Sequence, residues 1–190
     1  VLSLLAELNK KTNLWVELGL QTADAQSAAF IRRGYPLSVF TQAVYALAER
    51  NIPVVVHIIL GLPGESREPV LRTIDYLNRL PIQGVKLQLL HVLSDSDLAD
   101  LYRAGEYTPL EKEEYLTLVG DCIAHLRADI VLHRLTGDGD KNPLLAPLWS
   151  LRKRDVLNHL HRYLRENHIR QGMSCKIDLS VIYNKPKDVL

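Results

Sequence analysis

Polar residues and glycines that can bind a ligand gather in four segments, each directly after an apolar run. These segments are Gly19–Thr22, Leu60–Glu65, Leu90–Val92 and Leu135–Asp140. Glycine lets a ligand approach the backbone and reach its N–H groups, and the polar members add side-chain donors and acceptors. A single glycine of this kind is typical of any tight turn, whereas several such segments on one face favour a ligand site.

Three side chains around the first segment suit recognition of a polar ligand. Gln21 is a neutral amide that can hold a carboxylate, a ribose or another amide. Arg33 lies twelve residues further on, where a guanidinium can clamp a carboxylate or complement a helix C-terminus. Glu17 would be costly to bury unpaired. Strand alternation places it on the same face as Gln21, and we expect that face to line a barrel interior.

Histidine and cysteine offer little for a metal. His57, His91 and His133 lie on or at the ends of successive apolar runs, and imidazole is a common metal ligand. However, no carboxylate or cysteine lies at a spacing that would complete a site, so we expect no metal ligand in this chain. Cys122 and Cys175 are 53 positions apart and outside any CxxC pair, which excludes a disulfide framework and a cysteine metal motif.

Short strands that alternate with helices must position these residues. Apolar, often β-branched runs predict strands over 14–20, 53–60, 84–90 and 130–135. Helices are predicted over 1–8, 25–33, 36–50, 66–80, 108–127 and 149–168. Such alternation indicates right-handed βα units and a parallel sheet. We therefore expect an α/β fold whose four parallel units form half of a (β/α)₈ (TIM-type) barrel, with the site at the carboxyl ends of the strands.

Boundary signals refine these helices. Ser66 is expected to cap the helix that it precedes. Thr108-Pro109-Leu110-Glu111 is expected to form a capping box with proline at the first helical position. Residues 1–171 are expected to form one domain and residues 172–190 a tail, with a short strand at 177–183.

Composition limits the class of protein. The chain has 190 residues, 47% hydrophobic and 24% charged, which supports a packed core. We find no apolar run long enough for a membrane span and no signal-peptide pattern, and a reducing cytoplasm is expected. Residues 150–190 hold nine Lys and Arg against four Asp and Glu. This basic end can contact RNA phosphates, or it can simply be a solvated helix face. The candidate RNA contacts are six of these nine residues: Arg152, Lys153, Arg154, Arg162, Arg165 and Arg170.

In order and at these spacings, the motifs become specific. Glu17-Leu-Gly-Leu-Gln21-Thr, followed by Arg33-Gly34, resembles the E-x-G-x-Q-[ST]…R-G signature of radical S-adenosylmethionine (SAM) enzymes. The similar branch includes the Elongator catalytic subunit and oxygen-independent coproporphyrinogen oxidase. His57-Ile-Ile-Leu-Gly-Leu-Pro-Gly-Glu65 resembles that branch's next strand and its G-L-P-G-E turn. Segments 86–93, 114–115, 133–139 and 146–150 resemble a bacterial radical SAM subfamily of unassigned activity, and the likeness covers about residues 1–172.

The resemblance implies roles residue by residue. Arg33 would bind the carboxylate of SAM, and His57 stands where several relatives have Asp. The implied cofactor-binding residues are Glu17, Gln21, Arg33, Gly61, Pro63, Gly64, His91 and Leu93. The implied substrate-side residues are His57, Thr136 and Asp138.

The family's three-cysteine loop, which ligates a [4Fe–4S] cluster, is absent from the sequence. The resemblance therefore implies a C-terminal part, inactive alone, whose partner is a missing N-terminal half that carries the cluster. The parent would cleave SAM reductively to a 5′-deoxyadenosyl radical and act on an unknown substrate, with RNA among the candidates. We expect no membrane partner, and an exposed sheet edge allows self-association.

Two alternatives stay open at this point. The glycine turns also suit a nucleotide- or phosphate-binding half-barrel enzyme without radical chemistry, although neither turn matches a phosphate loop. The basic C-terminal helix also suits an RNA-binding module.

Overall fold

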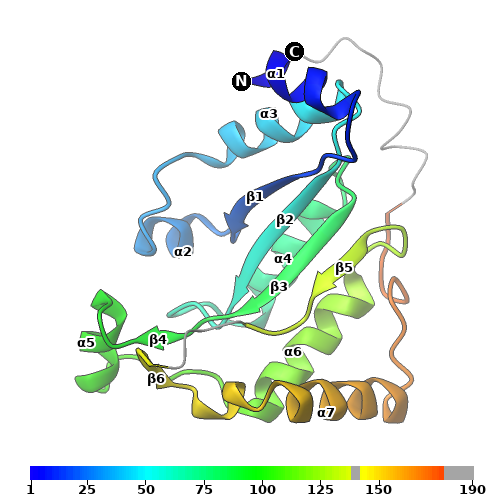
Figure 1. The fold of residues 1–190 in the computed structure, drawn as a ribbon. Coiled ribbons are helices and arrows are strands. Elements are labelled where there is room, and N and C mark those ends of the chain that lie inside the picture. Colours follow the sequence, from blue (N-terminus) through cyan, green and yellow to red (C-terminus); the bar gives the residue numbers. More distant parts are fainter. Residues whose placement is uncertain (138–141, 178–190) are drawn as a thin grey trace.

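A parallel four-stranded sheet forms the centre of the molecule (Figure 1). The computed structural model describes residues 1–137 and 142–177. The strands are β1 (Val16–Gln21), β2 (Val54–Leu60), β3 (Gly84–Leu89) and β5 (Val131–Arg134), paired in the order β1-β2-β3-β5. The prediction of four parallel βα units is therefore confirmed, and the described sheet is open rather than closed into a barrel.

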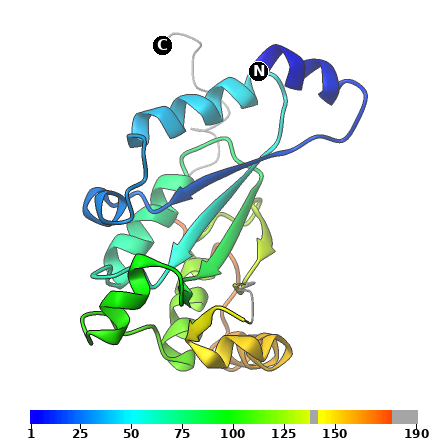
Figure 2. The same ribbon diagram turned by 60° about the vertical axis from the view of Figure 1, so that its left-hand side comes forward.

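Helices pack against one face of this sheet, and Figure 1 looks onto the other face, with α4 behind β2 and β3. The first four helices are α1 (Leu2–Asn9), α2 (Ala25–Phe30), α3 (Leu37–Ala48) and α4 (Arg67–Leu77). They are followed by α5 (Asp97–Arg103), α6 (Lys112–His125), the 3₁₀ helix η1 (Leu148–Leu151) and α7 (Lys153–Glu166). In the turned view of Figure 2, α2 and α3 lie beside β1, and α7 lies across the end of α6.

Strand alternation separates a packed face from an open one. Val54, Val56, Ile58 and Leu60 of β2 are almost completely buried in the core beneath the helices. The intervening residues point to the open face, where Val131 of β5 remains 58% exposed. The open face therefore carries the polar members of the strands.

A second, two-stranded antiparallel ladder was not predicted. It pairs β4 (Val92–Leu93) with β6 (Leu144–Ala146) just beyond the carboxyl ends of the main strands. Helix α5 was also not predicted. Strands of two or three residues are too short to show a hydrophobic period, which explains why the sequence pattern missed them.

Several predicted boundaries were wrong. The capping box is formed by Glu111 and Glu114, so the helix begins at Lys112 and the Thr108–Glu111 box is not formed. Ser66 is an N-cap residue, but its side chain makes no capping hydrogen bond. Helix α2 ends three residues before Arg33, and the predicted last helix is split by Arg152 into η1 and α7.

The segment after α7 packs against the body of the fold. Gly172 N donates to Ile123 O (3.2 Å) and Ser174 N donates to Ala124 O (2.8 Å). The predicted boundary at residue 171 stays a prediction, but residues 172–175 adjoin α6. Apart from Ile177, the strand predicted at 177–183 lies outside the described residues.

Candidate functional site

The end of β1 is shaped by Gln21, which has a positive φ of 61°. At this point the register between β1 and β2 shifts, so Gly19 pairs with His57 and Gln21 pairs with Ile58. With its nitrogen turned toward the strand, the Gln21 amide donates to the carbonyl oxygens of Gly19 (3.1 Å) and Leu20 (3.0 Å). The amide of Gln21 therefore folds back over Gly19, where a Cβ atom would clash with it.

The guanidinium of Arg33 is hydrogen-bonded to the same end of β1. Its Nη1 donates to the carbonyl oxygens of Leu20 (3.1 Å) and Thr22 (2.6 Å), and its Nε donates to Tyr35 O (3.1 Å). The guanidinium carbon lies 5.2 Å from the centre of the Tyr35 ring. No described residue accepts a hydrogen bond from Nη2. One edge of the guanidinium is therefore fixed by the protein, and the other has its donors available.

The G-L-P-G-E turn after β2 is joined to this strand end by a buried hydroxyl. Thr22 Oγ1 donates to Glu65 Oε1 (2.5 Å) and accepts from Asp24 N (3.0 Å). The Thr73 hydroxyl accepts from Ala23 N (2.9 Å). Burial raises the pKa of the Glu65 carboxyl above its usual value. The loop after β1 is therefore hydrogen-bonded both to the loop after β2 and to α4.

Two glycines in this turn have different surroundings. Gly61 has a φ of +90°, and its carbonyl accepts from Tyr107 Oη (2.8 Å). A Cβ atom at Gly61 would lie 3.1 Å from Leu110 Cδ1, whereas one at Gly64 (φ +72°) would meet no atom within 4 Å. The turn is therefore open at Gly64, beside the partly exposed Pro63, and closed at Gly61.

His91, just after β3, carries an orphaned polar atom. Its Nε2 is buried and has no hydrogen-bond partner among the described residues. Burial lowers the pKa of His91, which favours the neutral imidazole. Its ring fills the space above Gly137, where a Cβ atom would lie 2.6 Å from Cε1.

Three further predicted residues, Leu93, Thr136 and Asp138, come after β3 or β5 in the chain. Leu93 pairs with Leu144 in the small ladder. Thr136 is only 7% exposed and follows β5. Asp138 lies outside the described residues.

Glu17 and His57, predicted on the cofactor and substrate sides, meet on the open face. Glu17 Oε2 lies 2.6 Å from His57 Nε2, and both carboxylate oxygens lie 2.6 Å from Lys86 Nζ. Hydrogen bonding from Lys86 holds the pKa of Glu17 at about 2, with His57 and Trp15 contributing. Lys86 was missed as a site residue, although it is the one charged residue in the apolar run Gly84–Leu89.

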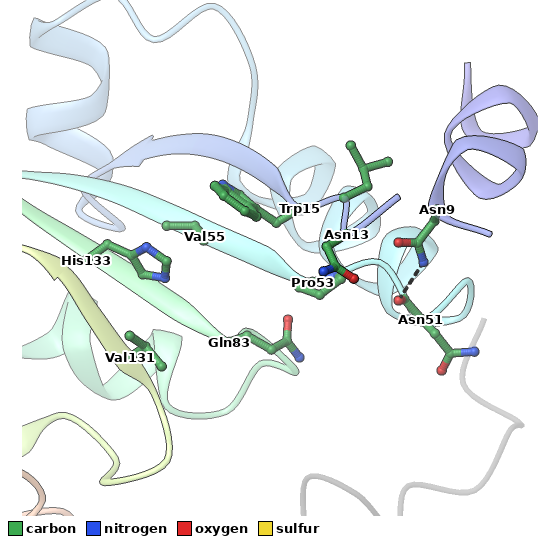
Figure 3. A pocket seen from close by; sticks show the side chains of 10 residues that line it. Asn9, Asn13, Trp15, Asn51, Pro53, Val55, Gln83, Val131 and His133 are labelled. Atoms are coloured by element: carbon green, nitrogen blue, oxygen red, sulfur yellow. Dashed lines mark hydrogen bonds between the residues drawn. The ribbon is translucent and has the colours of Figure 1, made fainter. Parts of the chain in front are cut away.

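A hollow of about 400 Å³ lies at the opposite, amino ends of the strands (Figure 3). Val55 of β2, His133 of β5 and Trp15, which precedes β1, line it, and Trp15 Nε1 donates to the Glu17 carboxylate (3.3 Å). The motif residues Gln21, Arg33 and His91 do not line it. In parallel α/β sheets chemistry occurs at the carboxyl ends of the strands, so we do not assign the ligand site to this hollow at their amino ends.

Comparisons with known proteins settle the family. The model of the Radical SAM superfamily matches residues 1–77, and that of the Radical_SAM C-terminal domain matches residues 82–166. The chain belongs to the radical SAM superfamily.

The curated relatives of this radical SAM chain are longer than the segment that matches it. It is 36% identical to the uncharacterized protein YtqA of Bacillus subtilis, over 90% of the chain and 53% of YtqA. It is 32% identical to protein YhcC of Escherichia coli K12, over 89% of the chain and 55% of YhcC. The tRNA uridine(34) acetyltransferase of Methanocaldococcus jannaschii is 23% identical over 85% of the chain and 29% of its own length. The chain thus spans about half the length of YtqA and YhcC.

The fold agrees with this family. The archaeal Elp3 of Methanocaldococcus infernus superposes with a TM-score of 0.73 at 17% identity, covering 87% of this chain and 39% of Elp3. At 17% sequence identity, this superposition shows that the two proteins share a fold.

The described residues of this radical SAM chain do not fit an iron–sulfur cluster. No group of three or more His, Cys, Asp or Glu side chains in residues 1–137 and 142–177 could hold a metal ion. Cys122 is buried in the core, and Cys175 Sγ lies 3.6 Å from Asn78 Nδ2. None of the described helices is both long and apolar enough to cross a membrane.

Proposed function

We propose that this chain is the SAM-binding and substrate-facing part of a radical SAM enzyme. The observation that carries the proposal is the guanidinium of Arg33, which is held at the end of β1 with Nη2 free of described partners. A carboxylate placed there would receive charge-assisted hydrogen bonds from a preoriented donor. When bound, SAM supplies the 5′-deoxyadenosyl group that is characteristic of the family.

Other groups at the same edge suit the rest of SAM. The buried Nε2 of His91 lacks a partner, and a polar ring of the ligand would remove that cost. The open side of Gly64 lets a ligand approach the backbone closely. Gln21 offers its amide oxygen to an ammonium or a hydroxyl. Gln21, Arg33, Gly64 and His91 come from the ends of three neighbouring strands or the segments that follow them, so they can bind one molecule.

We further propose that the cluster-binding cysteines belong to an N-terminal part of the same enzyme. YtqA and YhcC are about twice as long as the matched segment, which leaves room for such a part. The uncovered sheet face and the outer edge of β1 would then be completed by it rather than by self-association.

Reductive cleavage of SAM tests this function. The full-length protein that contains this chain should be reconstituted anaerobically with iron and sulfide, reduced with dithionite and assayed for 5′-deoxyadenosine. We expect production that is lost in Arg33→Ala. A protein with an intact cluster that forms no 5′-deoxyadenosine would contradict the proposal.

RNA binding by α7 is a second candidate function. Arg154, Asn158, His161, Arg162 and Arg165 are all exposed and recur at helical spacing on one side of α7. The last four line a hollow of about 670 Å³ together with Leu164. A row of cations on one helix face matches a phosphate backbone, and two similar proteins are tRNA uridine(34) acetyltransferases.

Salt dependence tests this second candidate. Binding of fluorescent transfer RNA should weaken steeply as salt increases, because phosphate contacts release counterions. Changing Arg154, Arg162 and Arg165 together to Gln should make binding less dependent on salt, so the logarithm of the binding constant should fall less steeply with the logarithm of the salt concentration. Changing the exposed Arg79, which follows α4, to Gln should leave this salt dependence unchanged, and equal salt dependences for both proteins would refute the α7 contact.

A further inference from the structure

Three side chains from neighbouring strands form what we call the strand cluster: Glu17 of β1, His57 of β2 and Lys86 of β3. Lys86 Nζ lies 2.6 Å from both carboxylate oxygens of Glu17, and His57 Nε2 lies 2.6 Å from Oε2. Trp15 Nε1 is a third donor, 3.3 Å from Oε1. Both oxygens of Glu17 are therefore occupied, and this carboxylate has little left to offer a ligand.

The two nitrogen partners, in contrast, retain binding capacity. An ammonium has three N–H donors, so Lys86 keeps at least one after bonding to Glu17. The ionised carboxylate only accepts hydrogen bonds, so His57 must carry a proton on Nε2, and no described residue bonds to its Nδ1. The side chains of Lys86 and His57 are 15% and 24% exposed. Both leftover groups can thus be reached from the open face.

The charge of this face favours an anion. Among the described strand residues that point to it, Glu17 is the one carboxylate, whereas Lys86, His57 and His133 are basic. Arg33 adds a further cation at the carboxyl edge. Glu17 balances the charge of Lys86, so the excess positive charge beside this face comes from Arg33, and a partly buried cation attracts anions.

A cluster of the same composition on the helices differs in what remains free. Lys112 of α6 bonds to Asp155 (3.3 Å) and to His159 Nδ1 (2.7 Å), while His159 Nε2 faces Asp155 at 3.6 Å. Both nitrogens of that histidine are engaged. It therefore provides a matched control for the strand cluster.

We propose that Lys86 and His57 bind an oxyanion, a carboxylate or a phosphate, on the substrate of this enzyme. One oxygen accepts from the free N–H of Lys86. A second oxygen of a carboxylate or phosphate accepts from Nδ1–H of His57 when the ring carries both protons, whereas the O–H of a hydrogen phosphate can instead donate to Nδ1 of the neutral ring. Glu17 is a positioning residue that orients both groups. That the oxyanion belongs to the substrate rests on the proposed function, whereas the existence of the anion site does not.

The indole proton of Trp15 provides the measurement, because its nitrogen donates to Glu17. The full 190-residue chain, labelled with ¹⁵N, should be titrated with inorganic phosphate and, separately, with acetate, each against sodium chloride at the same ionic strength. Its two tryptophans give two indole signals, and Trp15→Phe assigns them. We expect a saturating shift of the Trp15 signal with phosphate, acetate or both, and the more tightly bound ion identifies the oxyanion.

Variants locate the site. Lys86→Met should weaken binding about tenfold or more, as loss of a charge-assisted hydrogen bond requires. His57→Ala should weaken anion binding several-fold, while Glu17 keeps its hydrogen bonds to Lys86 and Trp15. This variant therefore tests the site even if Lys86→Met does not fold. Lys112→Met should bind as the unaltered chain does. A Trp15 signal that follows only ionic strength, or equal binding in His57→Ala and Lys112→Met, would overturn the proposal without bearing on SAM cleavage.

Discussion

Thr22 and Glu65, 43 positions apart, are joined by a hydrogen bond of 2.5 Å from Oγ1 to Oε1. This bond ties the loop after β1, which carries Gln21, to the loop after β2, which carries the glycine turn. The Thr22 side chain is buried, and the carboxyl of Glu65 is shielded from water. The relative position of the two loops therefore depends on a partly buried acid.

Glu65 should make stability depend on pH. Burial raises its pKa in the folded protein above the ordinary value of 4.5. The contribution of Glu65 to the free energy of unfolding is therefore fully present below pH 4.5. It is lost as the pH rises through the pKa of Glu65 in the folded protein. Glu65→Gln should remove this loss, so that the free energy of unfolding in urea falls less between acid and neutral pH. Glu68→Gln, which alters an exposed acid on α4, should keep the original pH dependence.

The ion pair of Glu17 and Lys86 should be visible in a titration. Hydrogen bonding from Lys86 holds the pKa of Glu17 at about 2, so its stabilising contribution is present above pH 4.5 and is lost as the pH falls toward 2. Carboxyl ¹³C chemical shifts should report this low value in the unaltered chain. In Lys86→Met the value should move up toward 4.5, whereas in Lys112→Met it should stay low. A Glu17 that titrates normally in the unaltered chain would show that the pair is not formed.

Much of this arrangement could be predicted from the sequence, because strand alternation and the rule for carboxyl ends depend only on local pattern. That reasoning placed Glu17 on the same face as Gln21. It could not find that Arg33 bonds to the carbonyl oxygens of Leu20 and Thr22, because that contact depends on how the chain turns after α2. Nor could it find Tyr107, whose hydroxyl reaches Gly61 from 46 positions away.

The two glycines of the turn should tolerate alanine differently. Both have positive φ angles, which cost an L-residue about 1–2 kcal/mol. At Gly61 the new Cβ atom would also press on Leu110 at 3.1 Å, whereas at Gly64 it would meet nothing. Thermal unfolding should therefore show a larger loss of stability for Gly61→Ala than for Gly64→Ala. Equal losses would mean that Leu110 moves aside without cost.

Arg127 should be the most sensitive charged residue of the fold. It is 2% exposed, and its guanidinium donates to Asn78 O (2.9 Å) and to the carboxylate of Asp129 (2.8 Å). Arg127→Met should destabilise the protein by about 3 kcal/mol or more, because it leaves buried acceptors unpaired. Urea unfolding should show this loss, while the exposed Arg79→Met should change stability by less than about 0.5 kcal/mol.

The affinity of the reconstituted full-length protein for SAM tests the central claim most directly, with Arg33→Ala compared against Arg32→Ala. Arg32 is the adjacent guanidinium, but it is exposed and paired with Asp97. Isothermal titration should show SAM bound at least about tenfold more weakly by Arg33→Ala, because a charge-assisted pair is lost, and unchanged binding by Arg32→Ala. Equal affinities in the two variants, with both proteins folded, would contradict the assignment of the β1 edge to the carboxylate of SAM.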